Sequence, residues 1–239
     1  MRTLFISDLH LTPSHHAMTE AFIRFMREDA PNADAVYILG DLFEFWVGDD
    51  DDCPLNKTVM NEIRTLVDSG TPCFFTQGNR DFLVGKKFEK KSGATLLGDE
   101  TLIDLYGIPT LLLHGDTLCT DDVKYQKFRQ KMHMPWLQWL YNRIPLSFRR
   151  KLVKKVQNNA NSQKQTKSYD IMDVNQDAVM DAMQRHHAQN MIHGHTHRPN
   201  IHNLDQGKKR IVLGDWYTQA SILEVTQQST RLYNHPFSE

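Results

Sequence analysis

Residues Thr3-Leu-Phe-Ile-Ser-Asp-Leu-His10 join a short apolar run to an Asp-x-His pair. The run has the length and the side chains of a buried strand, and the polar pair begins where that strand would end. Four further apolar runs are followed by Asp, Asn or His beside glycine: Gly40-Asp41, Gly78-Asn79-Arg80-Asp81, His114-Gly115-Asp116 and Gly194-His195-Thr196-His197. Because ligands bind at the carboxyl ends of the strands in an α/β sheet, this repeated arrangement predicts that the polar side chains meet at one place.

Strand-like and helix-like segments alternate along most of the chain. Short apolar runs predict strands at Thr3–Ser7, Ala35–Leu39, Pro72–Thr76, Thr110–Leu113, Asn190–Ile192, Arg210–Leu213 and Ser221–Val225. Apolar residues at helical spacing predict helices over Met18–Asp29, Lys57–Asp68 and Val174–His186, the last with Asp173 as its N-cap. This alternation predicts an α/β layered domain.

The segment from Asp122 to Ser168 departs from the alternation. It contains no strand-like run, and it reads as two or three helices interrupted by Pro135 and Pro145. It also carries many large apolar side chains. We therefore expect residues 122–168 to form a helical cap that is inserted into a core made of residues 1–121 and 169–239.

The charges of the chain are segregated, although their sum is close to zero. The 239 residues carry a formal net charge of −1, yet 12 of the 28 Lys and Arg residues lie between Val123 and Tyr169, where there is no Asp or Glu. The rest of the chain therefore holds 16 basic and 29 acidic residues. A basic segment on an acidic body indicates an anionic partner.

Composition excludes several classes of protein. With 40% hydrophobic and 24% charged residues, the chain is neither fibrous nor wholly disordered. Three cysteines without a C-x-x-C pair fit free thiols in a reducing compartment. No stretch approaches about 18 consecutive apolar residues, and Asp8 comes too early for a signal peptide. We therefore expect a cytoplasmic protein or one attached to the surface of a membrane.

The polar residues at the predicted strand ends are typical ligands of divalent metals. Imidazole and carboxylate groups without a nearby thiolate suit Mn²⁺, Fe or Zn²⁺. Seven candidates are more than a single ion needs: Asp8, His10, Asp41, Asn79, His114, His195 and His197. They suit two ions that share a bridging carboxylate and clamp both oxygens of a phosphoryl displacement.

The order Asp-x-His, Gly-Asp, Gly-Asn-Arg-Asp, His-Gly and Gly-His-Thr-His resembles the calcineurin-like metallophosphoesterases. Longer motifs, among them Ile171-Met-Asp-Val-Asn-Gln176 and His193-Gly-His-Thr-His-Arg-Pro199, resemble the UDP-2,3-diacylglucosamine hydrolase family within that group. The resemblance implies a layered β-sandwich core flanked by helices. It also implies hydrolysis of a lipid-linked UDP-sugar to lipid X and UMP in lipid A biosynthesis, with two Mn²⁺ ions as cofactors, although other divalent ions are possible.

The resemblance further assigns roles to individual residues. The first metal would be held by Asp8, His10, Asp41 and His197, with Asp41 bridging to a second metal that Asn79, His114 and His195 complete. The residues expected to contact substrate are Asn79, Arg80, Asp122, Tyr125, Lys164, Lys167 and His195. Arg80 stands where many members of the superfamily have a histidine that assists the leaving group. A guanidinium binds phosphate but donates no proton, which favours a pyrophosphate substrate.

The cap fits a lipid substrate, because its basic residues can meet phosphates and its apolar residues can surround acyl chains. The residues expected to line that acyl-chain chamber are Trp136, Trp139, Leu140, Leu146, Phe148 and Leu152. Apolar groups beside a basic face also fit peripheral attachment to the inner membrane. Neither nucleic acid nor an obligate protein partner is expected.

Other interpretations of the same residues stay open at this point. The chain can be a phosphoesterase acting on a soluble nucleotide or on a nucleic-acid phosphodiester. The apolar residues of the cap can form the core of a small helical subdomain, and the basic run can be a solvated helix face. A metallophosphoesterase fold that serves as a scaffold without catalysis is the least favoured, because every expected ligand is present.

Overall fold

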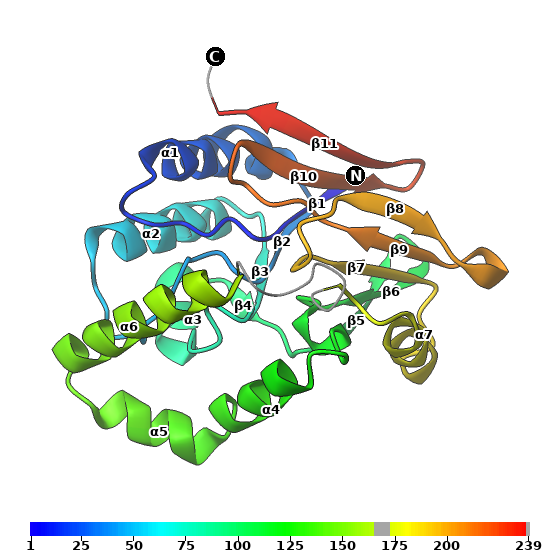
Figure 1. The fold of residues 1–239 in the computed structure, drawn as a ribbon. Helices are drawn as coiled ribbons and strands as arrows, with labels where there is room; N and C mark the ends of the chain where they lie inside the picture. The colour runs from blue at the N-terminus through cyan, green and yellow to red at the C-terminus, as the bar shows by residue number, and fades with distance from the viewer. Residues whose placement is uncertain (165–172, 238–239) are drawn as a thin grey trace.

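The computed structural model of the chain describes residues 1–164 and 173–237, with the side chains of 156–164 left undescribed. Two sheets are stacked face to face (Figure 1). The six-stranded sheet has the order β11 (Thr230–Pro236), β10 (Gln219–Thr226), β1 (Arg2–Ile6), β2 (Ala35–Leu39), β3 (Cys73–Thr76) and β4 (Thr95–Leu96). The five-stranded sheet has the order β5 (Thr101–Leu105), β6 (Ile108–Leu112), β7 (Asn190–His193), β9 (Lys209–Val212) and β8 (Asn200–Asn203).

Each sheet contains a run of parallel strands with antiparallel strands beside it. In one sheet β1, β2, β3 and β4 run parallel, and in the other β6, β7 and β9 do. Parallel strands point their carboxyl ends in the same direction, so the loops that follow them gather at one end of each sheet. The two sheets meet over a buried cluster that includes Phe5, Leu39, Leu112 and Ile192.

Helices cover the outer faces of the two sheets. The six-stranded sheet is covered by α1 (His16–Arg24), its π-helical continuation Phe25–Asp29, α2 (Pro54–Asp68) and α3 (Lys86–Ser92). The five-stranded sheet is covered by α7 (Gln176–Arg185), which packs Val179 and Met183 against Leu111 and Met191. These layers confirm the α/β sandwich flanked by helices.

All seven strands that the apolar runs predict are present, and the strands that the sequence pattern missed have a physical reason in common. β4 has two residues, and β5, β8 and β11 are mostly half-buried or exposed, so none of the four shows a continuous apolar run. The prediction of Asp173 as a helix N-cap was wrong. Asn175 caps α7 instead by accepting the backbone N–H groups of Asp177 and Ala178.

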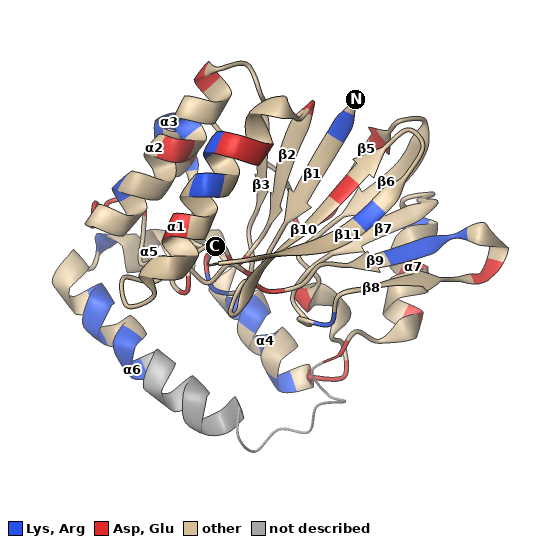
Figure 2. Ribbon diagram, turned by 90° about the horizontal axis from the view of Figure 1, so that it is seen from above, with Lys and Arg blue, Asp and Glu red and all other residues tan. Residues whose placement is uncertain are grey.

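Three helices occupy the segment expected to form the cap: α4 (Val123–Met132), α5 (Pro135–Arg143) and α6 (Leu146–Lys164). In Figure 1 they project from one end of the sandwich, with α6 turning back toward α3. Figure 2 shows Lys and Arg along α4 and α6. The expected boundary at residues 168 and 169 lies outside the described residues. No helix within 1–164 or 173–237 is long and apolar enough to cross a membrane.

The acidic run Asp49–Asp52 fixes α3 and α6 to the core. The Asp49 carboxylate accepts the N–H groups of Gly85, Lys87 and Phe88 at the start of α3. Arg149 of α6 is 1% exposed, donates to the carbonyls of Ile144 and Val47 at 2.8 Å, and pairs with Asp50. Two of the basic residues of the cap, Arg149 and its neighbour Arg150, which pairs with Asp51, therefore hold α6 in place.

Candidate dimetal centre

The polar residues at the strand ends come from both sheets. Asp8 and His10 follow β1, Asp41 follows β2, Asn79 follows β3, His114 follows β6, and His195 and His197 follow β7. Because the sheets are stacked with these ends on one side, the seven side chains surround one space. Two groups have ligand atoms within 4.8 Å of one another, one of Asp8, His10 and His197 and the other of Asp8, Asp41 and His114.

The first group is arranged around two imidazole nitrogens that face each other. Nε2 of His10 lies 3.4 Å from Nε2 of His197. Oδ1 of Asp8 lies 3.2 Å from Nε2 of His197 and 3.9 Å from Nε2 of His10. Nitrogen lone pairs and a carboxylate that converge in a buried space are suited to a shared divalent cation.

Asp41 lies between this group and the second. Its Oδ2 is 3.8 Å from Nε2 of His10 and 3.7 Å from Nε2 of His114. Nε2 of His114 is in turn 3.1 Å from Oδ1 of Asn79, and the rings of His114 and His195 are 5.0 Å apart. A carboxylate oxygen equidistant from the two histidines is placed as a bridging ligand would be, and the residues present fit two ions.

Backbone conformation singles out the same residues. Among the residues that the structure describes, five of the eight non-glycine residues with positive φ are candidate ligands: Asp8, His10, Asp41, His195 and His197. A left-handed backbone is unfavourable for residues with a Cβ and persists where the surrounding structure enforces it, often at functional sites. The strand ends therefore bend sharply so that consecutive polar side chains point into one space.

Two glycines allow the loops to approach the carboxylates closely. A Cβ on Gly194 would lie 2.2 Å from Oδ2 of Asp8, and one on Gly78 would lie 2.3 Å from Oδ1 of Asp41. Any side chain at either position would displace the carboxylate beside it. Backbone N–H groups take that space instead, since His195 donates to Asp8 at 2.9 Å and Arg80 donates to Asp41 at 2.8 Å.

Acceptors on the Nδ1 side orient three of the four histidines. His114 Nδ1 donates to the carbonyl of Leu39 at 2.9 Å, and Nδ1 of His10 lies 3.0 Å from Glu44. Nδ1 of His197 lies 3.3 Å from Asp215. A hydrogen bond from Nδ1–H to such an acceptor leaves Nε2 as the lone-pair donor toward the metal, which is the usual arrangement around metal-bound histidines. Sequence patterns gave no role to Glu44 or Asp215, because their function depends on contacts that form only in the fold.

Burial and the mixture of charges shift the pKa values of these groups in opposite directions. Burial lowers the pKa of His195 to about 4, and the charge of His114 contributes. Burial acts in the same sense on His114, but the carboxylates of Asp41 and Asp8 outweigh it and raise its pKa to about 9. Burial favours the neutral form of Asp8, yet its close contact with His197 and the charges of the nearby imidazoles hold its pKa well below its ordinary value.

Asp81 connects the loop after β2 with the loop after β3 through hydrogen bonds. This fully buried carboxylate accepts N–H groups of Gly78, Asp41 and Leu42 at 2.7 to 3.2 Å. Burial, with the charge of Asp41, raises its pKa to about 7. The last residue of the Gly-Asn-Arg-Asp motif therefore supports the ligand loops and does not itself face the metal space.

The residues expected to contact substrate differ in how the structure places them. The Arg80 guanidinium is half-buried with its Cζ 4.9 Å from the centre of the Phe45 ring. Asp122 caps α4 by accepting the Tyr125 N–H at 3.0 Å, and the Tyr125 ring faces that of His195 at 6.5 Å. Lys164 is the last residue of α6 and its side chain is not described, and Lys167 lies outside the described residues.

Tyr125 and Arg129 connect the first cap helix to the metal loop through Asp116. The Tyr125 hydroxyl donates to Asp116 at 2.5 Å, and Arg129 donates to the same oxygen at 2.7 Å. Burial opposes ionisation of Asp116, but His114 and Arg129 outweigh it and lower its pKa to about 2. This junction sets the position of α4 beside His195.

The residues expected to form the acyl-chain chamber have little cover from the protein. Trp136, Trp139, Leu140, Phe148 and Leu152 are all about half exposed or more, and Leu146 is partly buried. Among the described cap residues, Arg149 alone is fully buried. The alternative interpretation of these side chains as a helical subdomain core was therefore wrong, because they do not bury one another.

Comparison with known families decides the identity of the fold. Residues 1–199 match the calcineurin-like phosphoesterase family. The chain is a calcineurin-like phosphoesterase. This match confirms the resemblance that the strand-end motifs indicated, and it agrees with candidate metal ligands distributed over the two sheets.

Curated relatives of this phosphoesterase match it from end to end. It is 58% identical to a UDP-2,3-diacylglucosamine hydrolase of Vibrio parahaemolyticus, with 100% of both chains covered. It is 56% identical to the protein of the same name from Vibrio atlanticus, over 100% of this chain and 99% of that one. A third, from Vibrio cholerae, is 54% identical over 98% of each chain. The aligned region includes the cap helices.

Proposed function

We propose that this protein hydrolyses the pyrophosphate bond of UDP-2,3-diacylglucosamine and releases lipid X and UMP for lipid A biosynthesis. The observation that carries the proposal is the convergence of two groups of candidate metal ligands beside a cap whose apolar side chains are exposed. Two relatives that are named UDP-2,3-diacylglucosamine hydrolase are more than half identical to this chain over its full length.

We infer that Asp8, His10, Asp41 and His197 hold one divalent ion and that Asp41, Asn79, His114 and His195 hold the second. The mixture of imidazole, carboxylate and amide donors suits Mn²⁺. When bound, the two ions lower the pKa of a water molecule and neutralise charge on the phosphoryl oxygens. The protein positions these ligands through the bent strand ends, Asp81 and the acceptors on Nδ1.

Arg80 is placed to bind the diphosphate. Its backbone N–H donates to Asp41, and its guanidinium lies over the Phe45 ring. A permanently charged fork binds phosphate oxygens and donates no proton. Water attacks the uridylyl phosphorus, the bond to the bridging oxygen breaks, and the lipid phosphate leaves without being protonated.

The cap is proposed to hold the lipid. Acyl chains that lie against Trp136, Trp139, Leu140, Leu146, Phe148 and Leu152 would cover apolar surface that the protein leaves exposed. Asp122, Tyr125, Lys164 and Lys167 would then meet the sugar and phosphate groups. Because Asp122 already caps α4 and the Tyr125 hydroxyl is bound to Asp116, these two would act mainly by placing α4 beside the substrate.

We also infer peripheral attachment to the cytoplasmic face of the inner membrane. The exposed apolar side chains of the cap lie beside basic ones, as where Arg143 covers the Trp139 ring at 4.3 Å and Lys151 lies 5.8 Å from the Phe148 ring. Apolar groups that enter the lipid and cations that meet anionic headgroups together favour docking to a membrane surface. Vesicle co-sedimentation with and without anionic lipid measures this attachment.

The test of the activity is phosphorus NMR of the products formed from UDP-2,3-diacylglucosamine by the purified protein with Mn²⁺. Equal amounts of UMP and lipid X are expected, and oxygen from labelled water should appear in UMP. Release of UDP or inorganic phosphate would refute the bond assignment. Hydrolysis of small phosphodiesters with no turnover of the lipid would show instead a phosphoesterase for soluble nucleotides or nucleic acid.

A further inference from the structure

A second concave site lies on the outer face of the five-stranded sheet. It is a cavity of about 360 Å³, at the small end of the range for small-molecule sites. Arg210 pairs in register with Met191, whose side chain packs with α7, so Arg210 points to the helix-covered face. The polar residues that line the cavity are Asp173, Thr196, Arg198, Asn200, His202 and Arg210.

Arg210 places a buried positive charge at this cavity. It is 9% exposed, and its Nη1 lies 3.4 Å from Nε2 of His193. Its Nε is buried and has no hydrogen-bond partner among the residues that the structure describes. Burial also lowers its pKa, with Asp173 opposing that shift. A buried guanidinium with an unpartnered donor is costly, and an anion in the cavity would remove that cost.

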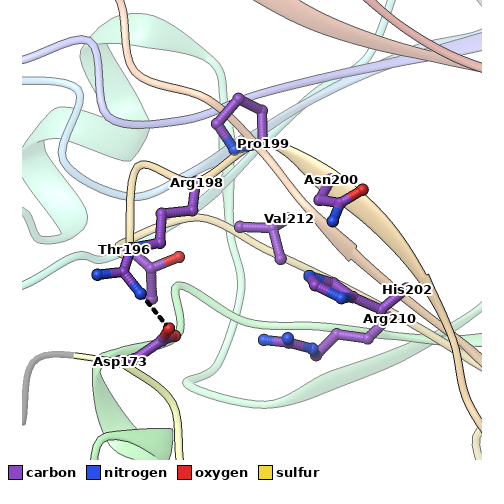
Figure 3. Close-up of a pocket in the computed structure, with 8 residues that line it drawn as sticks. All are labelled: Asp173, Thr196, Arg198, Pro199, Asn200, His202, Arg210 and Val212. Carbon is purple, nitrogen blue, oxygen red and sulfur yellow. Dashed lines mark hydrogen bonds and ion pairs between the residues drawn. The ribbon is translucent and has the colours of Figure 1, made fainter. Parts of the chain in front are cut away.

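The other lining residues add donors to those of Arg210. Figure 3 shows Arg210 extending under His202 toward Thr196 and Asp173. Arg198 reaches the same side and donates to Asp173 at 2.5 Å. The two arginines and the one carboxylate leave a net positive charge, and a hydroxyl, an amide and an imidazole complete the lining. Such a surface favours an anion with several acceptor oxygens.

The cavity and the metal centre share one loop. Thr196 lines the cavity and stands between the metal-ligand candidates His195 and His197, and Arg198 follows them. The motif residues Asp173 and Arg198, to which the dimetal centre gives no role, therefore meet here as an ion pair.

We propose that this cavity is a second anion site that binds the phosphate of a uridine nucleotide, with Arg210 and Arg198 as donors to its oxygens. Asn200 and His202 are then the polar groups nearest to the nucleoside. The choice of a uridine nucleotide rests on the proposed function, whereas the anion site rests on Arg210 and its surroundings alone.

The test is isothermal titration calorimetry of the full-length protein in Mn²⁺ with UMP, uridine and inorganic phosphate. Asp8→Asn disables the metal centre, which binds phosphate itself, and leaves the cavity intact. Arg210→Gln in that background removes the buried cation. Lys209→Gln removes the same charge from the adjacent residue of β9, whose exposed side chain points to the opposite face. No lipid substrate is used, so the result is independent of turnover.

UMP and phosphate are expected to bind Asp8→Asn protein, and Arg210→Gln should weaken UMP binding at least about tenfold, whereas Lys209→Gln leaves it within about twofold. Loss of all UMP binding in Asp8→Asn, or unchanged affinity in Arg210→Gln, would overturn the site. Uridine binding as tightly as UMP would overturn the role of the phosphate, and phosphate binding without UMP would overturn the nucleotide. Arg210→Gln should also keep its melting temperature, and a clear drop would assign Arg210 to fold support instead.

Discussion

The candidate metal centre buries polar side chains, whereas the helical cap exposes apolar ones. At the centre, the polar side chains of Asp8, His10, Asp41 and His114 are almost completely buried. In the cap, tryptophan and phenylalanine side chains are largely exposed, as at Trp136 and Phe148. Each region therefore has groups that a bound ligand would stabilise. Converging carboxylates and imidazoles are stabilised by cations, and exposed aromatic side chains are stabilised by apolar ligands.

The two regions also differ in what holds them in place. The loops of the centre are fixed by backbone hydrogen bonds to Asp81 and by packing between two sheets. The cap is joined to the core by charged junctions on two of its helices, Arg129 of α4 with Asp116 and Arg149 of α6 with Asp50. The described residues of the cap form no apolar core of their own, so we expect the cap to open locally more easily than the loops of the centre.

Removal of the bridging carboxylate gives the largest expected effect. Asp41→Asn should reduce hydrolysis on the order of a thousandfold, because several kcal/mol of charge stabilisation in the transition state depend on the shared metals. The control is Asp205→Asn, an exposed carboxylate in the turn before β9, which should stay within twofold. Activity of Asp41→Asn near the wild-type rate would contradict the dimetal assignment. Both rates are measured by UMP release at saturating Mn²⁺.

Substitutions of two tryptophans, one in the core and one in the cap, should differ in their effect on the free energy of unfolding. Trp216 is fully buried, donates to the Ser221 carbonyl at 3.0 Å and packs on Phe25, so Trp216→Ala should cost about 3–5 kcal/mol in the free energy of unfolding. Trp136 is 63% exposed, so Trp136→Ala should change that free energy by less than about 0.5 kcal/mol. Urea denaturation measures both. A large cost at Trp136 would mean that the cap buries this residue in a core of its own.

The junction at Arg149 tests whether charge holds the cap to the core. Arg149→Met leaves the buried carbonyl of Val47 without its donor, at a cost of about 1–3 kcal/mol. Amide hydrogen exchange in α6 should accelerate, while hydrolysis of a small phosphodiester stays within twofold. Lys154→Met is the control, because it removes a positive charge from an exposed position of the same helix. Unchanged exchange in Arg149→Met would show that the cap is held by other contacts.

Glu44 tests the support behind the metal ligands. Glu44→Gln removes the charge that faces Nδ1 of His10 at 3.0 Å, and such changes lower metal affinity about 10- to 100-fold. Glu62→Gln, which breaks the surface pair with Arg27, should leave the affinity unchanged. Mn²⁺ titration calorimetry compares them, and equal affinities in the two variants would remove Glu44 from the centre.

The pH dependence of metal binding follows from the histidine pKa values. With a pKa of about 9, His114 is protonated at neutral pH and must release that proton to bind a metal. Burial lowers the pKa of His10, but Glu44 and Asp41 outweigh it and raise that pKa as well. Mn²⁺ affinity should therefore rise at least about tenfold per pH unit from pH 7 to about 9 and then level off. The pKa of His195 is about 4, so this residue adds no slope in that range. Affinity that is flat over this interval would show that His114 is not a ligand.

The sequence predicted the central strands and the order of the ligands, because both depend on local patterns. Apolar runs identify strands that are buried on two faces, and a polar pair at the end of each run marks the functional edge of the sheet. Edge strands such as β8 and β11 escaped prediction since their side chains are only partly buried. Lys167 and the second boundary of the cap stay predictions.

The sequence alone determined which residue types are available for metal and phosphate, and it placed them at the ends of buried strands. Only the tertiary structure decided their orientation, because the positive φ angles at Asp8, His10 and Asp41 are enforced by loops from both sheets. It also decided that Asp215 supports His197 and that Arg210 lines a separate cavity. These relations join residues distant in the chain, and burial and contact between such residues exist only after folding.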